Sequence, residues 1–162
     1  KRLGLDAARR AQERRMSPQA LTRFLHANIP LTAAMQVQVR ICEETRVQIA
    51  APLAPNLNHH GTAFGGSLAV LGILAGWTLL HHALELRGIA AKLVVQKNET
   101  EYLGPAGAEL LAESSLQAGA WEDFLAQLGK RGRARIRLTS EIRADGRAAV
   151  KSAGTFVAVL NS

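Results

Sequence analysis

Apolar and polar residues alternate with a period of two along much of this chain, and this period is typical of β-strands with one buried face. Six stretches have this alternation or the composition of a strand: residues 35–41, 45–51, 92–103, 109–116, 133–143 and 147–160. Asp145-Gly146 lies between the last two stretches and is a strong signal for a tight hairpin turn. The first two stretches are also close enough in sequence to form a hairpin.

A long helix is predicted between the second and third of these strands. It runs from about Gly65 to Arg87 and is apolar on nearly every side in its first half, as a helix surrounded by other structure must be. Gly88 is the expected residue just beyond its C-terminal end. Gly72, Gly76 and Thr78 interrupt its apolar run, which is shorter than the ~20 residues that cross a bilayer. We therefore expect a buried helix and no membrane span.

Two other segments have helical character. Residues 5–27 are predicted to be helical, with Ser17 as an N-cap residue and Pro18 at the first position of the helix that follows it. Trp121, Phe124 and Leu128 have helical spacing in a short insert between two strands.

The order of these elements predicts the fold class. It runs helix, two strands, long helix and four strands, and a mostly antiparallel sheet folded around the long helix accounts for it, an α+β arrangement. The 162 residues, of which 48% are hydrophobic, fit a single core. We assign residues 1–27 to an N-terminal helical segment and residues 28–162 to the sheet domain.

The net charge of +7 indicates an anionic partner. Arg133, Arg135 and Arg137 alternate with apolar residues, so one face of their strand is basic and could hold phosphates. Aromatic residues make up only 4% of the chain, and none is interleaved with the arginines, which disfavours nucleic acid.

The cysteine and histidine content bears on cofactors and on the compartment. Cys42 is the only cysteine, so neither an intrachain disulfide nor a cysteine-based metal cage is expected. His81 and Glu85 share a helix face, but nothing local adds further ligands, so we expect no metal or cofactor. No apolar segment follows the basic start of the sequence, and we expect a cytoplasmic protein.

Candidate chemistry lies directly before the long helix. Polar side chains gather there within seven positions: Asn56, Asn58, His59, His60 and Thr62. Gly65 and Gly66 follow where the helix begins, and the unpaired N–H groups of a helix start suit a carbonyl oxygen or an anion. The segment is therefore our candidate site.

The run Asn58-His59-His60-Gly61-Thr62-Ala63-Phe64-Gly65-Gly66, followed by an apolar helix, resembles the loop-to-helix motif of the hotdog-fold acyl thioesterases. With residues 51–58, Ser67, Gly76-Trp77, Tyr102 and Pro105, the chain more narrowly resembles the thioesterase family typified by the C-terminal domain of the bacterial YiiD protein. The resemblance implies a hotdog fold and a homodimer, or a dimer of dimers, with sites between subunits. Its substrates would be acyl thioesters of coenzyme A or of acyl carrier protein.

The sequence departs from the related phenylacetate-type thioesterases in two places. Ile73 stands where those enzymes have an acidic base or nucleophile, and Phe64 stands where a histidine is usual. The resemblance therefore leaves open a non-catalytic module that binds acyl thioesters or carrier protein, and a hydratase or dehydratase. Glu99 and Glu101 are alternative acids on the next strand, where they share a face with Lys97.

If the protein is an enzyme, the loop must carry most of the chemistry. The expected catalytic residues are Asn58, His60 and Thr62, and the expected substrate-binding residues are Asn56, Phe64, Gly65, Gly66, Ser67, Arg133, Arg135 and Arg137. His60 is preferred because adjacent side chains on an extended backbone point opposite ways. The alternative is structural: the two asparagines bond the local backbone, and Thr62 caps the helix.

Overall fold

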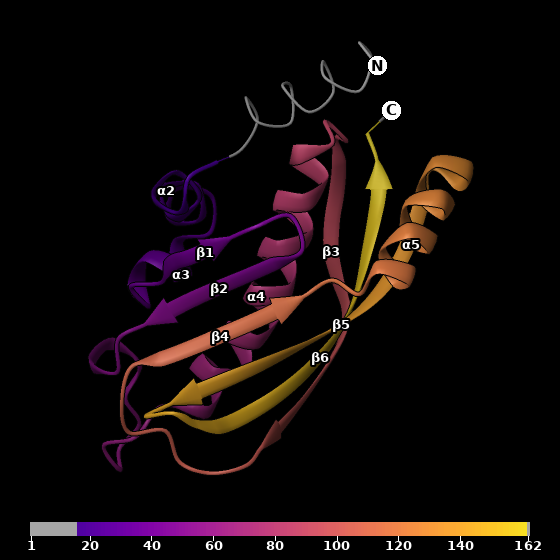
Figure 1. Cartoon of the computed structure of the whole chain (residues 1–162). Coiled ribbons are helices and arrows are strands. Elements are labelled where there is room, and N and C mark those ends of the chain that lie inside the picture. Colours follow the sequence, from indigo (N-terminus) through magenta and orange to yellow (C-terminus); the bar gives the residue numbers. More distant parts are fainter. Residues whose placement is uncertain (1–15, 162) are drawn as a thin grey trace.

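The computed structural model describes residues 16–161, and its centre is one six-stranded sheet (Figure 1). The strands are all antiparallel, in the order β1-β2-β4-β5-β6-β3. Their bounds are Gln38–Cys42 (β1), Arg46–Ala51 (β2), Ala91–Tyr102 (β3), Leu110–Ser115 (β4), Arg133–Ala144 (β5) and Arg147–Leu160 (β6). The six predicted strands and the α+β class are thus confirmed.

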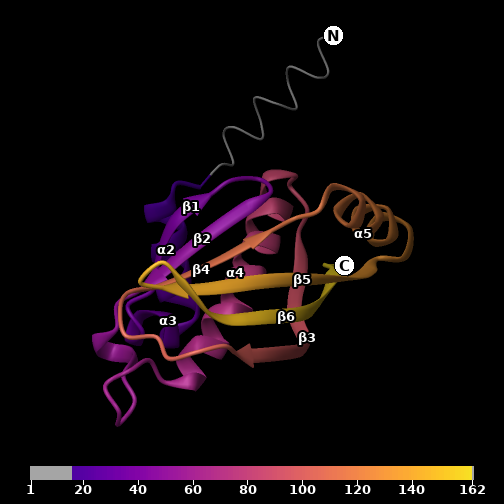
Figure 2. The same ribbon diagram turned by 60° about the horizontal axis from the view of Figure 1, so that its bottom comes forward.

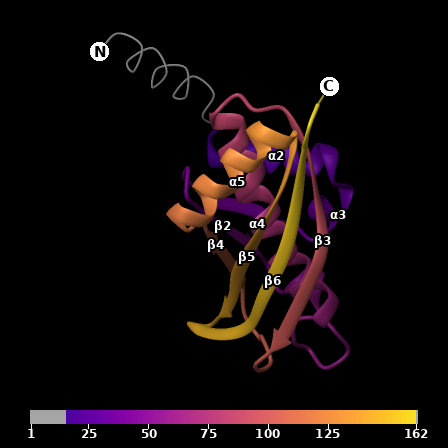
Figure 3. The same ribbon diagram turned by 90° about the vertical axis from the view of Figure 1, so that its right-hand side faces the viewer.

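The long helix α4 (Gly65–Leu86) packs against the inner face of the curved sheet. Figure 3 shows β6 and β3 in front, with α4 running behind them. Two glycines permit a close approach to β6: a Cβ at Gly72 would lie 2.6 Å from the Cβ of Ser152, and one at Gly76 would lie 2.8 Å from the Phe156 ring. The inward residues of the strands complete one hydrophobic core around this helix.

Two short helices precede the sheet, α2 (Pro18–Asn28) and α3 (Pro30–Ala34). The predicted cap is confirmed, because the Ser17 side chain accepts a hydrogen bond from the Ala20 N–H. Leu21 and Leu25 are fully buried, and the Thr22 hydroxyl accepts a bond from the Val39 N–H of β1. The earlier part of the predicted helical segment, residues 5–15, lies outside the described residues.

β4 is half as long as β5 and leaves the first part of β5 without a strand partner on that side. Helix α5 (Ala118–Arg131) lies along this part of β5. β4 pairs with β5 only from Ser140 to Ala144. Figure 2 shows α5, β5, β6 and β3 side by side in that order. Trp121, Phe124 and Leu128, the residues with helical spacing, are the buried face of α5. The insert is therefore a full helix that covers the first half of β5.

Backbone turns follow the sequence signals closely. Asp145 and Gly146 have positive φ values of 51° and 72°, which a two-residue hairpin of this kind requires. Gly88, just beyond the end of α4, has φ of 67°, the left-handed conformation typical of a residue that ends a helix.

Among the described helices, α4 alone is long and apolar enough to cross a bilayer. From the sequence, its interrupted apolar run was expected to be too short for this. However, 67% of its most apolar window is buried by the rest of the chain. This burial is typical of the central helix of a globular core.

Candidate functional site

The loop before α4 is held by hydrogen bonds from Asn56. This residue ends a short 3-10 helix (Ala54–Asn56) and is 2% exposed. Its Nδ2 donates to the carbonyl oxygens of Met35 and Pro52, at 3.0 and 2.8 Å. Its Oδ1 is buried and has no hydrogen-bond partner among the described residues. Asn56 therefore anchors the loop and keeps one acceptor unused.

Asn58 organises the tip of the loop with both ends of its amide. Its Oδ1 accepts from the N–H groups of His60 and Thr62, at 2.8 and 3.1 Å. Its Nδ2 donates to the Thr62 Oγ1 at 2.9 Å. These bonds agree with the structural interpretation of an asparagine at a turn. Asn58 has little capacity left to hold a water molecule, but it fixes the two other candidate residues of the loop.

The two histidines lie side by side, and the expectation that they point opposite ways is wrong. The ring centroids of His59 and His60 are 3.8 Å apart, and both residues are exposed. The expectation assumed an extended backbone, whereas these residues form a turn that ends at Gly61, with φ of 77°. The loop thus carries a pair of imidazole rings at its exposed tip.

α4 begins without a side-chain cap. Phe64 is the N-cap residue, so Thr62 does not cap the helix, and no side chain among the described residues bonds the first turn. The Phe64 N–H is occupied, because it donates to the Asn56 carbonyl at 2.7 Å. The next three N–H groups, of Gly65, Gly66 and Ser67, have no intrahelical partner, as at every helix start. They are the donors available to a ligand.

Aromatic rings border this helix start. The Tyr102 hydroxyl donates to the Gly65 carbonyl at 2.8 Å, and its ring lies 3.4 Å from where a Cβ on Gly65 would be. The Phe64 ring lies over Gly66, where a Cβ would come within 2.3 Å of it. Both rings are more than half exposed. They therefore form an apolar rim around a polar helix start.

Ile73 is apolar and half-buried, so α4 supplies no carboxylate near its start. Trp77 continues the same face of the helix, and its Nε1 donates to the Leu93 carbonyl of β3 at 3.0 Å. Its ring stacks on His81, which stacks in turn on Phe24 of α2. Burial lowers the pKa of His81, against a smaller opposing effect of Glu85.

A polar cluster on the inner side of the sheet was not predicted from the sequence. The Ser152 hydroxyl of β6 donates to the Asn98 Oδ1 of β3 at 3.0 Å, and the Asn98 Nδ2 donates to the Thr100 Oγ1 at 2.9 Å. Thr100 precedes Tyr102 by two residues, about 7 Å along the strand. The cluster therefore lies close to the start of α4. A bond between residues 54 positions apart leaves no local signal in a sequence.

The predicted arginines do not join the loop within one chain. Arg133, Arg135 and Arg137 are exposed on the outer face of the sheet. Tyr102, which marks the level of the α4 start, aligns across β6 with Ile142 of β5. Arg137 is thus five residues away, about 17 Å along the strand, and Arg133 about 30 Å.

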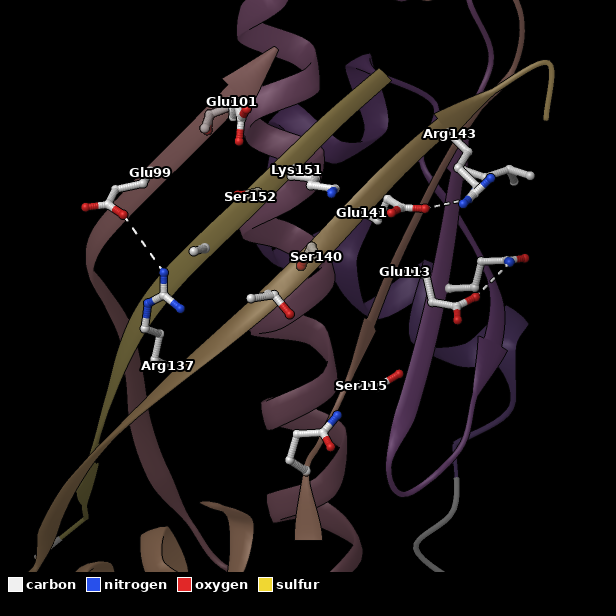
Figure 4. Close-up of a pocket in the computed structure, with 16 residues that line it drawn as sticks. Glu99, Glu101, Glu113, Ser115, Arg137, Ser140, Glu141, Arg143, Lys151 and Ser152 are labelled. Carbon is white, nitrogen blue, oxygen red and sulfur yellow. Dashed lines mark hydrogen bonds and ion pairs between the residues drawn. The ribbon is translucent and has the colours of Figure 1, made fainter. Parts of the chain in front are cut away.

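The outer face also holds the two alternative acids. Glu99 and Glu101 line a hollow of about 780 Å³ on the side of the sheet away from α4 (Figure 4). The hydrogen bond and charge of Lys97, 2.6 Å away, lower the pKa of Glu99. Other charges of this hollow are also paired: Arg143 with Glu141 at 2.5 Å and Arg46 with Glu113 at 3.1 Å. Neither acid is placed to serve its own loop.

No group of three or more metal-ligating side chains occurs in residues 16–161.

The sheet folded around α4 is a hotdog fold, and solved structures share it. A protein of unknown function from Chlorobaculum tepidum superposes with a TM-score of 0.85 and 24% identity, covering 91% of this chain and 99% of that chain. A structure described as a putative thioesterase from Shewanella oneidensis has a TM-score of 0.78 and 25% identity, covering 88% and 96%. A thioesterase from Haemophilus influenzae has a TM-score of 0.65 and 14% identity, covering 90% and 92%.

The chain therefore has a hotdog fold. Residues 18–160 match the family described as "Putative thioesterase (yiiD_Cterm)", and the chain belongs to that family. The resemblance found in the loop and the central helix is confirmed.

Proposed function

We propose that this protein hydrolyses acyl thioesters of coenzyme A or acyl carrier protein at the start of α4. The observation that carries the proposal is the uncapped helix start, with N–H groups open at Gly65, Gly66 and Ser67. The buried, unpartnered Oδ1 of Asn56 beside Phe64 is a second polar group without a partner in residues 16–161. A thioester carbonyl suits the N–H donors, and the apolar rim suits an acyl chain.

The proposed reaction adds water across the thioester. The water oxygen bonds to the carbonyl carbon, the carbonyl oxygen becomes an oxyanion, and the N–H groups of Gly65 and Gly66 stabilise it. The C–S bond then breaks and releases a carboxylic acid and a thiol. His60 takes the proton of the water and returns it to the leaving sulfur, while the Thr62 hydroxyl orients the water. Asn58 is a positioning residue for both through its bonds to their N–H groups.

A homodimer formed along β3 is part of the proposal. β3 ends the sheet order, so one side of its backbone has no strand partner among the described residues. Large exposed apolar side chains gather along this edge and beside it: Phe64, Val94, Val95, Tyr102 and Leu103. An open apolar edge is a template for pairing with another chain. Such pairing would also cover the helix start and place the site between two subunits.

Asn98 and Thr100 are a second candidate for holding the water. They lie on the inner side of the proposed interface strand, and the Thr100 hydroxyl retains its own proton for donation. A water bound there would approach the thioester from the strand, whereas one bound by Thr62 would approach from the loop.

The test is hydrolysis of a panel of acyl-CoA chain lengths, followed through the free thiol. The wild type should turn over part of the panel, and Thr62→Ala and His60→Ala should each lower kcat by about tenfold or more, the scale of a lost acid or base. Asn98→Ala tests the strand candidate, with Asn28→Ala on the exposed end of α2 as its matched control. No turnover above background on any chain length refutes the hydrolase.

A binding module is the second candidate function, and Ile73 is the observation that favours it. Helix α4 itself carries no carboxylate before Glu85, so an acyl thioester could be held at its start without being cleaved. This candidate predicts saturable binding of an acyl-CoA, measured by calorimetry, with the thioester recovered intact. Release of thiol during the titration would exclude it.

A cytoplasmic location also belongs to the proposal. The chain has a single cysteine, Cys42, and cannot form an intrachain disulfide, which suits a reducing compartment.

A further inference from the structure

The outer surface of β5, β6 and β3 combines exposed valines with cationic side chains. The cations lie on the two flanking strands, β5 and β3. Because partners in an antiparallel pair face the same side, the strand registers place these residues opposite one another. Arg133 aligns with Val159 and Lys92 in one row across the sheet, and Arg135 aligns with Val157 and Val94 in the next. A third row contains Arg137, Thr155 and Lys97. We call the surface made by these nine residues the basic strip.

Its charges are not balanced within the described chain. Arg133 and Arg135 form no ion pair with any residue in the range 16–161. Glu99 lies next to the third row, where it forms an ion pair with Lys97 and is 4.0 Å from Arg137. Lys130 and Arg131 in the last turn of α5 add positive charge at the end next to Arg133. The basic strip therefore attracts an anionic partner.

Its apolar component is also exposed. Val94 and Val159 are 55% and 41% exposed, and Val157 between them is half-buried. Phosphate groups alone would gain nothing from these valines, whereas a protein surface would bury them. The pattern therefore favours an acidic protein over a nucleotide.

The dimensions fit one α-helix. The outer two strands of the strip are separated by two inter-strand spacings, about 10 Å, which is the width of a helix with its side chains. The three rows extend about 14 Å along the strands, or between two and three helical turns. A helix lying along β6 would rest its apolar stripe on the valines and place carboxylates beside the arginines on one side and the lysines on the other.

We propose that the basic strip docks an acidic, amphipathic helix of the protein that carries the acyl thioester. The inference rests on the proposed function and on the proposed pairing along β3. Strands in an antiparallel pair run in opposite directions, so the Lys92 end of β3 would lie beside the Tyr102 end of β3 in the second copy. The basic strip of one subunit would then lie at the same end of the β3 pair as the α4 start of the other, on the opposite face of the continuous sheet.

The experiment compares one acyl group on three carriers: an octanoyl-loaded bacterial acyl carrier protein, octanoyl-CoA and octanoyl-N-acetylcysteamine. Arg133→Glu/Arg135→Glu should lower the ratio of kcat/KM on the carrier protein to kcat/KM on the cysteamine thioester by about tenfold or more. Arg133→Gln/Arg135→Gln should give a smaller decrease. Arg23→Glu/Arg147→Glu, the same charge change at exposed positions outside the strip, should leave the ratio unchanged.

Direct binding separates this inference from the proposed function. Anisotropy of a fluorescently labelled acyl carrier protein reports docking without turnover, and the wild type should bind with an affinity that falls as salt rises. If no thioester is hydrolysed but this binding is present and lost in the double variant, hydrolysis fails and the docking surface stands.

Three results would overturn the docking surface. The first is carrier-protein binding that is equal in the wild type and in Arg133→Glu/Arg135→Glu. The second is a larger kinetic loss on octanoyl-CoA than on the carrier protein, which would assign the strip to nucleotide phosphates. The third is a wild-type tetramer that the double variant converts to a dimer in light scattering, which would assign the strip to another copy of this chain.

Discussion

Gly72→Ala is expected to destabilise the protein although alanine is the better helix former. The substitution is worth about 1 kcal/mol in favour of a helix interior. Here, however, the new Cβ would lie 2.6 Å from both the Cβ and the Oγ of Ser152, so α4 and β6 must move apart. Overpacking of a core costs about 1–3 kcal/mol, and a contact this short belongs at the upper end, which leaves a net loss of about 2 kcal/mol.

The assay is urea denaturation of a matched set of variants. Gly129→Ala in α5 is the control, because nothing lies within 4 Å of its Cβ position, and it should stabilise by about 1 kcal/mol. Ser152→Gly removes both atoms that the new methyl group meets, so Gly72→Ala should cost much less in that background. The double-mutant cycle should give a coupling of about 2–3 kcal/mol.

The same variant also tests the site. Displacing Ser152 breaks its bond to Asn98, so Gly72→Ala should lower thioester hydrolysis if the Asn98–Thr100 pair holds the water. Equal stability of Gly72→Ala and wild type, or an unchanged cost in the Ser152→Gly background, would refute the close-contact reasoning.

Three further predictions concern pH, assembly and the helix start. The pKa of His81 is lowered by burial below its ordinary value of 6.5, so the unfolded chain binds the proton more readily. The free energy of unfolding should therefore decrease as the pH drops below about 6.5. His81→Phe should make this decrease between about pH 7.5 and about pH 5.5 smaller, as measured by urea denaturation. An equal decrease in the variant and the wild type would contradict the prediction. Val95→Lys should convert a dimer to monomer in light scattering, whereas Leu31→Lys, at a still more exposed position on α3, should not. Tyr102→Phe should cost at most about 1 kcal/mol, because the lost bond to the Gly65 carbonyl is exposed; a larger loss would show that the hydroxyl holds the helix start.

The elements of the fold were predictable because their signals are local. The alternation in β5 matches its burial pattern residue by residue, and the hairpin after it uses the two residues whose positive φ the turn requires. Ser17 and Gly88 mark helix ends through interactions within a few residues. The resemblance carried by the loop and by Gly65-Gly66 then added the family.

The parts that were missed depend on the backbone path or on distant partners. The orientation of His60 required the turn that ends at Gly61, which alternation cannot predict. The Phe64 N–H is taken by a carbonyl eight residues earlier, so the open donors at the helix start begin at Gly65. The Asn98–Ser152 bond and the distance between Arg137 and the loop both follow from sheet topology. No local pattern reports that topology.

The half-length strand β4 also determines how many chains can share this sheet. Where β4 stops, α5 covers the flank of β5, and at the far end β1 is a five-residue strand with a bulge and α2 against it. Within residues 16–161, β3 is the one long, uncovered flank. When the β3 strands of two copies pair, neither chain has a long uncovered edge strand left, so the assembly stops at a dimer. The helices at the other borders thus protect against fibre formation while a paired assembly remains accessible.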